Sequence, residues 1–146
     1  MDKNALFRKF VAFTTAVHQA SYELTKGVKS SEVTVLQYRI LEYLAVSQPV
    51  TLSEISDCMD MSMPNTSREM KKLIEKKLCK KVPAEGDRRK LMIRLSDMGE
   101  SMMNEAFGRI QDRFFQRFKS VSDEEFAEIE RALDLLQTKI FNSKPE

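Results

Sequence analysis

The stretch from residue 51 to residue 96 constrains the fold of this chain more than any other part of the sequence. Residues 51–54 read TLSE, the composition of a capping box, in which a hydroxyl and a carboxylate bind free amides at a helix start. Ser62 and Pro64 then mark the start of a second helix, because serine caps helix N-termini and proline is tolerated in the first turn. A short helix followed by a second, basic helix predicts a helix-turn-helix, whose second helix can enter the DNA major groove.

Two short apolar segments, 78–82 and 91–95, follow the basic helix and can pair as antiparallel strands around the loop 83–90. The loop ends in three consecutive cations that repel one another, Arg88, Arg89 and Lys90. An anionic partner such as the DNA minor groove would explain such a loop. The alternative is a solvated turn in which Asp87 pairs with a neighbouring arginine, and the two interpretations are compatible. The hairpin therefore predicts a basic wing beside the helix-turn-helix.

Helical periodicity divides the basic helix into two faces. The residues predicted to point inward are Met63, Thr66, Met70, Leu73 and Ile74. The residues predicted to point outward are Pro64, Asn65, Arg68 and Lys72, with Ser67 and Lys71 at the edges. Arginine can donate to guanine edges, asparagine binds adenine edges, and hydroxyl or ammonium groups bind phosphates. We therefore predict that the outward and edge residues contact DNA, together with residues 87–90 of the wing.

Charge is concentrated in the same region. Residues 61–95 contain 11 Lys or Arg and 4 Asp or Glu, a net charge of +7, whereas the whole chain carries +2 and the remainder therefore −5. A localised basic surface favours a polyanionic partner more than total charge does. An ordinary solvated helix and hairpin would be the alternative explanation.

Helices are predicted on both sides of this module. One spans residues 3 to about 26 and another 33 to 45, while Ser96 and Ser122 cap two more after the hairpin. All nine phenylalanines lie in the chain's two ends, outside the central segment. We expect a mostly α fold with a small β-hairpin wing, in which a winged helix-turn-helix module (33–95) is flanked by dimerisation helices (1–28 and 96–146) of one domain spanning 1–146. The predicted assembly is a two-fold homodimer, and the alternative is a monomer whose core these helices complete.

Signals for catalysis, metals or membranes are weak. The single histidine, His18, lacks a recognisable catalytic constellation, and no phosphate-binding loop is present. We expect no catalytic residue, no metal site and no cofactor. No apolar run approaches the roughly 20 residues of a membrane span, and the first residues lack the layout of a signal peptide. We therefore expect a cytoplasmic protein that does not bind membranes.

Two further predictions concern small molecules and oxidants. His18 and Tyr22 place polar atoms on an otherwise apolar stripe of the first helix, which suits an aromatic or phenolic effector, although the stripe could equally be dimer interface. Cys58 and Cys79 lack metal-ligand spacing. Each is expected to be a small core residue, with oxidant sensing as the alternative.

The chain resembles the MarR family of bacterial transcriptional regulators over essentially its whole length. The resemblance rests on residues 51–55 (TLSEI), the run 67–73, and Asp87-Arg88-Arg89 followed by 91–96 (LMIRLS) and Gly99. It implies a dimer whose terminal helices form the interface and whose recognition helices enter successive major grooves of a palindromic operator. In that pattern Arg89 is the wing arginine and Asp87 positions the loop. The chain departs from many relatives at Lys77, where they have glycine, at Thr66, where they have an apolar residue, and in lacking a cysteine near the start of the first helix.

Together these observations predict a dimeric, sequence-specific DNA-binding transcriptional regulator, a repressor released by a small molecule. Two alternatives stay open at this point. One is a winged-helix adaptor that binds an acidic protein partner, and the other is a regulator that senses oxidants through its cysteines.

Overall fold

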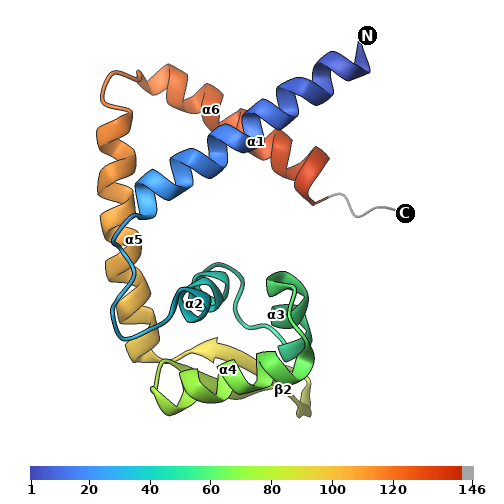
Figure 1. Ribbon diagram of the computed structural model, residues 1–146, viewed down its shortest axis with the longest axis vertical. Coiled ribbons are helices and arrows are strands. Elements are labelled where there is room, and N and C mark those ends of the chain that lie inside the picture. Colours follow the sequence, from blue (N-terminus) through green and yellow to red (C-terminus); the bar gives the residue numbers. More distant parts are fainter. Residues whose placement is uncertain (143–146) are drawn as a thin grey trace. The chain divides into compact units, whose positions relative to one another are not determined.

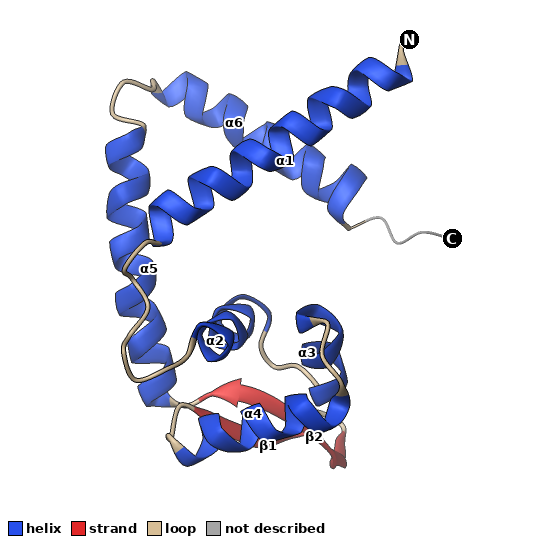
Figure 2. Cartoon of the chain, viewed as in Figure 1, coloured by secondary structure: helices blue, strands red, loops and turns tan. Residues whose placement is uncertain are grey.

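The computed structural model describes residues 1–142, so the last four residues of the predicted segment 96–146 lie outside the described part (Figures 1 and 2). The helices and strands are, in order, α1 Lys3–Thr25, α2 Val35–Ser47, α3 Leu52–Met59, α4 Met63–Glu75, β1 Cys79–Ala84, β2 Asp87–Leu95, α5 Asp97–Arg117, α6 Asp123–Leu136 and the π-helical turn Gln137–Phe141. The predicted fold class, mostly α with a small β-hairpin, is confirmed. The chain forms two compact units, Met1–Gln111 and Asp112–Glu146, and the boundary falls within α5.

Side-chain caps define where the helices begin. Ser62 Oγ accepts from Asn65 N at 3.2 Å and starts α4, and Ser96 Oγ accepts from Gly99 N at 3.0 Å at the start of α5. Ser122 forms the predicted capping box with Glu125. At α3 only half of the predicted box is present, because the Glu54 carboxylate accepts from the Thr51 hydroxyl (3.2 Å) instead of binding the Thr51 amide.

The core lies in the winged-helix module. Ile40, Leu41 and Leu44 of α2, Ile55 of α3 and Leu73 of α4 are fully buried. The predicted division of α4 holds for most of its inward residues: Thr66, Met70 and Leu73 are buried and Ile74 is half-buried. Met63 was wrongly predicted to point inward, since its side chain is 45% exposed. Met63 is the first residue of α4, so there is no preceding helical turn whose apolar residues would cover its side chain.

The hairpin differs from the predicted eight-residue loop. β1 and β2 pair antiparallel from Cys79–Leu95 to Pro83–Leu91, and Ala84 then pairs with Asp87, so the tip is the two-residue turn 85–86. Gly86 adopts a φ of 82° there, a conformation that favours glycine. The register shift between Pro83 and Ala84 leaves residues 88–90 without partners on β1, which makes them a bulge of the kind that re-aims side chains.

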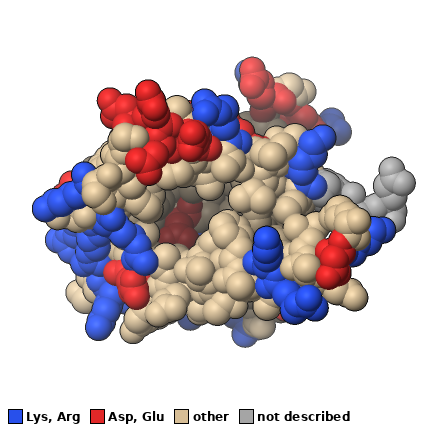
Figure 3. Space-filling model, turned by 90° about the horizontal axis from the view of Figure 1, so that it is seen from above, with Lys and Arg blue, Asp and Glu red and all other residues tan. Residues whose placement is uncertain are grey.

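The terminal helices contrast with this module. Within the described residues, none of α1 or α6 is buried, and α5 buries only Gly99, Met103 and Ala106. Large apolar side chains are exposed on α1, namely Leu6, Phe7, Val11, Phe13, Val17 and Tyr22. The second unit exposes Phe114, Phe115, Ile129, Leu133 and Leu135. Figure 3 shows a face on which residues other than Lys, Arg, Asp and Glu, drawn in tan, form broad areas, with groups of charged side chains mostly toward the edges of the view.

Candidate nucleic-acid interface

The outward face of α4 is exposed and already ordered. Pro64, Asn65, Arg68 and Lys72 are all exposed, as are the edge residues Ser67 and Lys71. The guanidinium of Arg68 donates from Nη2 to Asn65 Oδ1 at 2.7 Å and from Nε to the Pro64 carbonyl at 3.4 Å. Asn65 and Arg68 therefore form one hydrogen-bonding unit near the N-terminal end of the helix, with further donors of both side chains left to face solvent.

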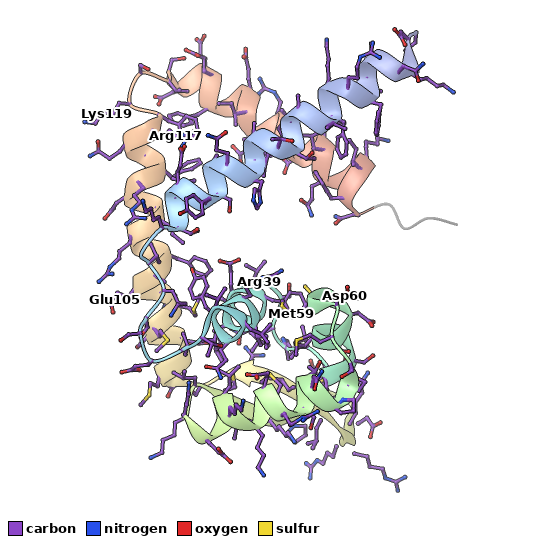
Figure 4. All side chains as sticks on the ribbon, in the orientation of Figure 1. Arg39, Met59, Asp60, Glu105, Arg117 and Lys119 are labelled. Carbon is purple, nitrogen blue, oxygen red and sulfur yellow. The ribbon has the colours of Figure 1, made fainter. Side chains whose placement is uncertain are left out.

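A turn holds α4 against α3. Asp60 ends α3 in the left-handed conformation, with a φ of 52° (Figure 4). Ser56, which is buried, donates from its hydroxyl to the Met61 carbonyl, and the Met61 amide donates to the Ser56 carbonyl at 3.0 Å. Thr66, fully buried, donates to the Ser62 carbonyl at 2.8 Å. The hydroxyl of Thr66 is thus satisfied inside the module and turned away from the outward face.

The wing presents its cations from the bulge. Arg88, Arg89 and Lys90 are all exposed. Asp87 Oδ1 accepts from the backbone amide of Arg89 at 3.0 Å, so that carboxylate binds the backbone of the bulge. Between α4 and the hairpin lies a groove of about 720 Å³ that Ser67 and Lys71 of α4, Lys81 of β1 and Leu91 of β2 help to line.

A polar network that was not predicted from the sequence lies on the side of α4 that faces α2. The side chain of Gln37, from α2, donates to Glu69 Oε2 at 3.1 Å and accepts from Lys76 Nζ at 2.8 Å. Lys72 Nζ lies 3.4 Å from Glu69 Oε1. No signal within the sequence identifies this network, because its partners are 32 and 39 residues apart and glutamine carries no periodic apolar pattern.

The two predicted effector residues do not line the hollow that Tyr38 of α2 borders. His18 and Tyr22 are both exposed on α1. A hollow of about 470 Å³ lies instead between the loop 28–32, Tyr38 of α2 and the residues of α5 around Met102 and Arg109, and neither His18 nor Tyr22 lines it. Glu105 of α5 also lines this hollow and accepts from Arg109 at 3.2 Å (Figure 4).

Tyr38 is the residue of that hollow with the most unusual environment. Its hydroxyl is buried and has no hydrogen-bond partner among the described residues. Burial, and to a lesser degree the negative charge of Glu42, raise the pKa of Tyr38 to about 12. A buried phenol without a partner costs free energy, and the nearby Glu42 carboxylate disfavours loss of its proton.

The two cysteines lie in different environments. Cys58 on α3 is exposed and borders a hollow of about 330 Å³ with Arg39, Tyr43 and Met59 (Figure 4). Cys79 on β1 is buried, and burial raises the pKa of its thiol to about 12. The described residues contain no group of three or more His, Cys, Asp or Glu that could hold a metal ion. They also include no helix with the length and apolar character that crossing a membrane requires.

Known proteins resemble the chain in both sequence and structure. Residues 31–90 match the model of the MarR family. An uncharacterised HTH-type transcriptional regulator of Bacillus subtilis (strain 168), YsmB, is 29% identical over 105 residues, which make up 72% of each protein. A MarR family protein from Bacillus stearothermophilus superposes with a TM-score of 0.78 at 20% identity, over 97% of this chain and 99% of that one. Over residues 31–90 this chain is similar to the MarR family, and its fold is that of a MarR family structure.

Other solved structures share the fold with lower TM-scores. MepR from S. aureus, solved bound to ethidium bromide, has a TM-score of 0.63 at 19% identity, covering 96% of this chain and 97% of MepR. A MepR mutant bound to an oligodeoxyribonucleotide has a TM-score of 0.55 at 18% identity, covering 90% and 97%. The residues that match the MarR family model, 31–90, contain the helix-turn-helix and all three wing cations. The chain therefore has the winged helix-turn-helix fold of a transcriptional regulator.

Proposed function

We propose that this chain is a MarR family regulator, a homodimer that binds a palindromic operator, represses transcription there and is released by a small molecule. The observation that carries the proposal is the exposed face of α4, capped by Ser62 and bearing the Asn65–Arg68 pair, in the same module as the three-cation bulge of the wing. A cap and an internal hydrogen bond fix these donors before DNA arrives, which reduces the entropy lost on binding.

Each exposed residue has a role suited to its chemistry. Asn65 and Arg68 would contact base edges, whereas Pro64 brings the helix N-terminus close to the backbone. Ser67, Lys71 and Lys72 would bind phosphates. Arg88, Arg89 and Lys90 would enter the minor groove, with Asp87 holding the backbone of the bulge. The MepR complex with an oligodeoxyribonucleotide supports DNA as the partner.

The exposed apolar side chains of α1 and of the second unit support a dimer. A helix with several exposed phenylalanine, leucine and valine side chains is rare on a soluble monomer, because contiguous apolar surface favours association. Phe7 of α1 is 64% exposed and Leu133 of α6 58% exposed. A second copy of the chain would bury these side chains and, through two-fold symmetry, present two α4 helices to two half-sites.

The hollow bordered by Tyr38 is the proposed effector site. Lys29 and Arg109 bring cationic groups to its wall, and the aromatic residue Tyr38 also lines it, which suits an aromatic acid or a phenol. MepR in complex with ethidium bromide shows an aromatic compound bound to a protein of this fold. His18 and Tyr22 are proposed as additional effector contacts, provided that the second copy covers α1. By linkage, an effector that lowers operator affinity must bind less tightly to the DNA complex.

The proposal is tested by selecting duplexes from a random library with the full chain and measuring the affinity of Arg68→Ala for the selected duplex and for random DNA. We expect Arg68→Ala to cost about 1–3 kcal/mol on the selected duplex and much less on random DNA. Arg39→Ala, which removes an exposed arginine of α2 outside the DNA-facing set, is the matched control and should change neither. Equal losses on both duplexes would make Arg68 a phosphate contact. Failure to enrich any duplex would favour the adaptor alternative over DNA recognition.

A further inference from the structure

Gln37 is an unusual residue for the core of this module. Gln37 is only 2% exposed, and its side-chain amide makes three hydrogen bonds. Oε1 accepts from the Thr34 amide at 3.1 Å and from Lys76 Nζ at 2.8 Å, while Nε2 donates to Glu69 Oε2 at 3.1 Å. A buried amide is costly unless it is satisfied, and once satisfied it selects one arrangement of its partners over others.

The partners of Gln37 lie along one side of α4. Glu69, Lys72 and Lys76 occupy positions i, i+3 and i+7, so they share a helix face. Lys76 Nζ also donates to the Glu32 carbonyl at 2.7 Å, which fastens the C-terminal end of α4 to the loop before α2. Glu69 in turn holds Lys72, one of the exposed cations proposed to bind phosphate. The network therefore reaches from a capped helix start in α2 to the DNA-facing side of α4.

We propose that Gln37 is a positioning residue for DNA recognition: through Glu69 and Lys76 it fixes the rotation of α4 about its own axis, and so the direction of Arg68 and Lys72. The proposal rests on the DNA-binding function proposed above and goes beyond it, because Gln37 and Glu69 themselves are not proposed to touch DNA. Glu69 would otherwise be unfavourable there, since a carboxylate beside the DNA backbone repels phosphate.

Two contacts on one face of a helix resist rotation more strongly than one. Glu69 and Lys76 are two turns apart and both bind the same amide, so a twist of α4 must stretch at least one of the two bonds. The buried side chains of Met70 and Leu73 hold α4 against the core. Apolar packing is less directional than hydrogen bonds, so it restrains rotation of the helix less. Sequence discrimination depends on direction, because base edges are read by geometry.

The test exchanges the donor and the acceptor of the hydrogen bond between Gln37 and Glu69. Gln37→Glu keeps an acceptor for Thr34 and Lys76 but sets a carboxylate against Glu69. Adding Glu69→Gln restores a hydrogen bond between the two positions with the donor on the other side. The matched control is Gln48→Glu, because Gln48 makes the same kind of amide–carboxylate bond to Glu100 (3.3 Å) and accepts from Leu95 N (2.8 Å) away from α4.

The measured quantity is the ratio of affinities for a duplex selected by the unmodified chain and for a random duplex. We expect Gln37→Glu to lower this ratio about tenfold and the double variant to return it to within about threefold of the original. Gln48→Glu should leave the ratio unchanged even if it lowers thermal stability. An unchanged ratio in folded Gln37→Glu, or a double variant no better than the single one, would overturn the proposal.

A second variant covers the case in which Gln37→Glu does not fold. Glu69→Ala removes the carboxylate that links Gln37 to Lys72. The Glu69 side chain is 18% exposed, so the change is made at a partly accessible position and not at the buried Gln37. Glu69→Ala should raise the affinity for random DNA, because a negative charge is lost. It should still lower the ratio of the affinity for the selected duplex to that for random DNA. A ratio that stays constant or rises in Glu69→Ala would contradict the positioning role.

The function and the positioning role can fail separately. If the unmodified chain selects no duplex, the proposed function fails. Hydrogen exchange of the α4 amides still tests the positioning, because Gln37→Glu should reduce their protection and the double variant should restore it. Equal protection in all three chains would overturn the positioning role whatever the chain binds.

Discussion

Replacing Gly99 with alanine tests how α5 is docked against the wing. Gly99 is buried in the first turn of α5, and a Cβ there would fall on the carbonyl oxygen of Leu78, 3.0 Å from its carbon and 3.4 Å from Leu95 Cδ2. The carbonyl of Leu78 belongs to the backbone and cannot rotate away from the new Cβ as a side chain could. The start of α5 must therefore move away from Leu78, the residue before β1. The same carbonyl accepts from Ser96 N at 3.0 Å, and Ser96 Oγ donates to the Lys77 carbonyl at 2.6 Å.

The magnitude follows from these contacts. Two backbone-directed hydrogen bonds contribute about 0.5–1.5 kcal/mol each, and overpacking a core typically costs about 1–3 kcal/mol. Alanine is favoured over glycine in a helix by about 1 kcal/mol, which offsets part of the loss. We therefore expect Gly99→Ala to lower the free energy of unfolding by about 3 kcal/mol.

The assay is urea unfolding followed by circular dichroism at one fixed chain concentration, because association would shift the midpoint. Gly108→Ala is the matched control: it lies in the same helix and its Cβ would have nothing within 4 Å, so it should stabilise by about 0.5–1 kcal/mol. Opposite signs for the two glycines are the expected result. A Gly99→Ala chain as stable as the parent, with an unchanged denaturant slope, would refute the reasoning.

Three further outcomes are expected. Lys77 directly follows the C-cap residue of α4, Lys76, and has a φ of 63°. Its amide and that of Leu78 donate to the Ile74 and Leu73 carbonyls, so Lys77→Gly should raise the free energy of unfolding by about 1 kcal/mol in the same urea assay. Iodoacetamide at pH 8 should label Cys58 in the folded chain and leave Cys79 unlabelled, as mass spectrometry would show, because burial raises the pKa of Cys79 to about 12; labelling of both would contradict its burial. Arg89→Ala should weaken binding to a selected duplex strongly and leave the unfolding midpoint unchanged, because an exposed cation contributes little to stability, and unchanged affinity at physiological salt would remove the wing from the interface.

Periodicity predicted the two faces of α4 well because one helix face must be buried. Thr66, Met70 and Leu73 point inward and Asn65 and Arg68 outward, as expected from 100° per residue. The prediction that Met63 is buried was wrong because Met63 is the first residue of α4, and no earlier helical turn is present to cover it. The predicted start of α2 was two residues early, since the Thr34–Gln37 capping box was not recognised.

The wing and the polar network were harder to predict for different reasons. The hairpin strands extend to the turn 85–86, but charged residues near the tip hide the alternation that identifies a strand. Gln37 and Tyr38 acquire their significance from residues distant in the chain, namely Glu69, Lys76 and the wall of the hollow. Long-range polar contacts leave no local pattern, so a sequence alone could not distinguish Gln37 from an exposed glutamine.

The exposure of α1 and α6 has a consequence for gene dosage. No described residue of either helix is buried, so a second copy of the chain, as we propose, would supply the missing cover. While most chains are single, the number of paired chains follows the square of their concentration, and halving expression leaves about a quarter of the pairs. Dilution of the protein by cell growth would then relieve its target genes abruptly, even without a ligand.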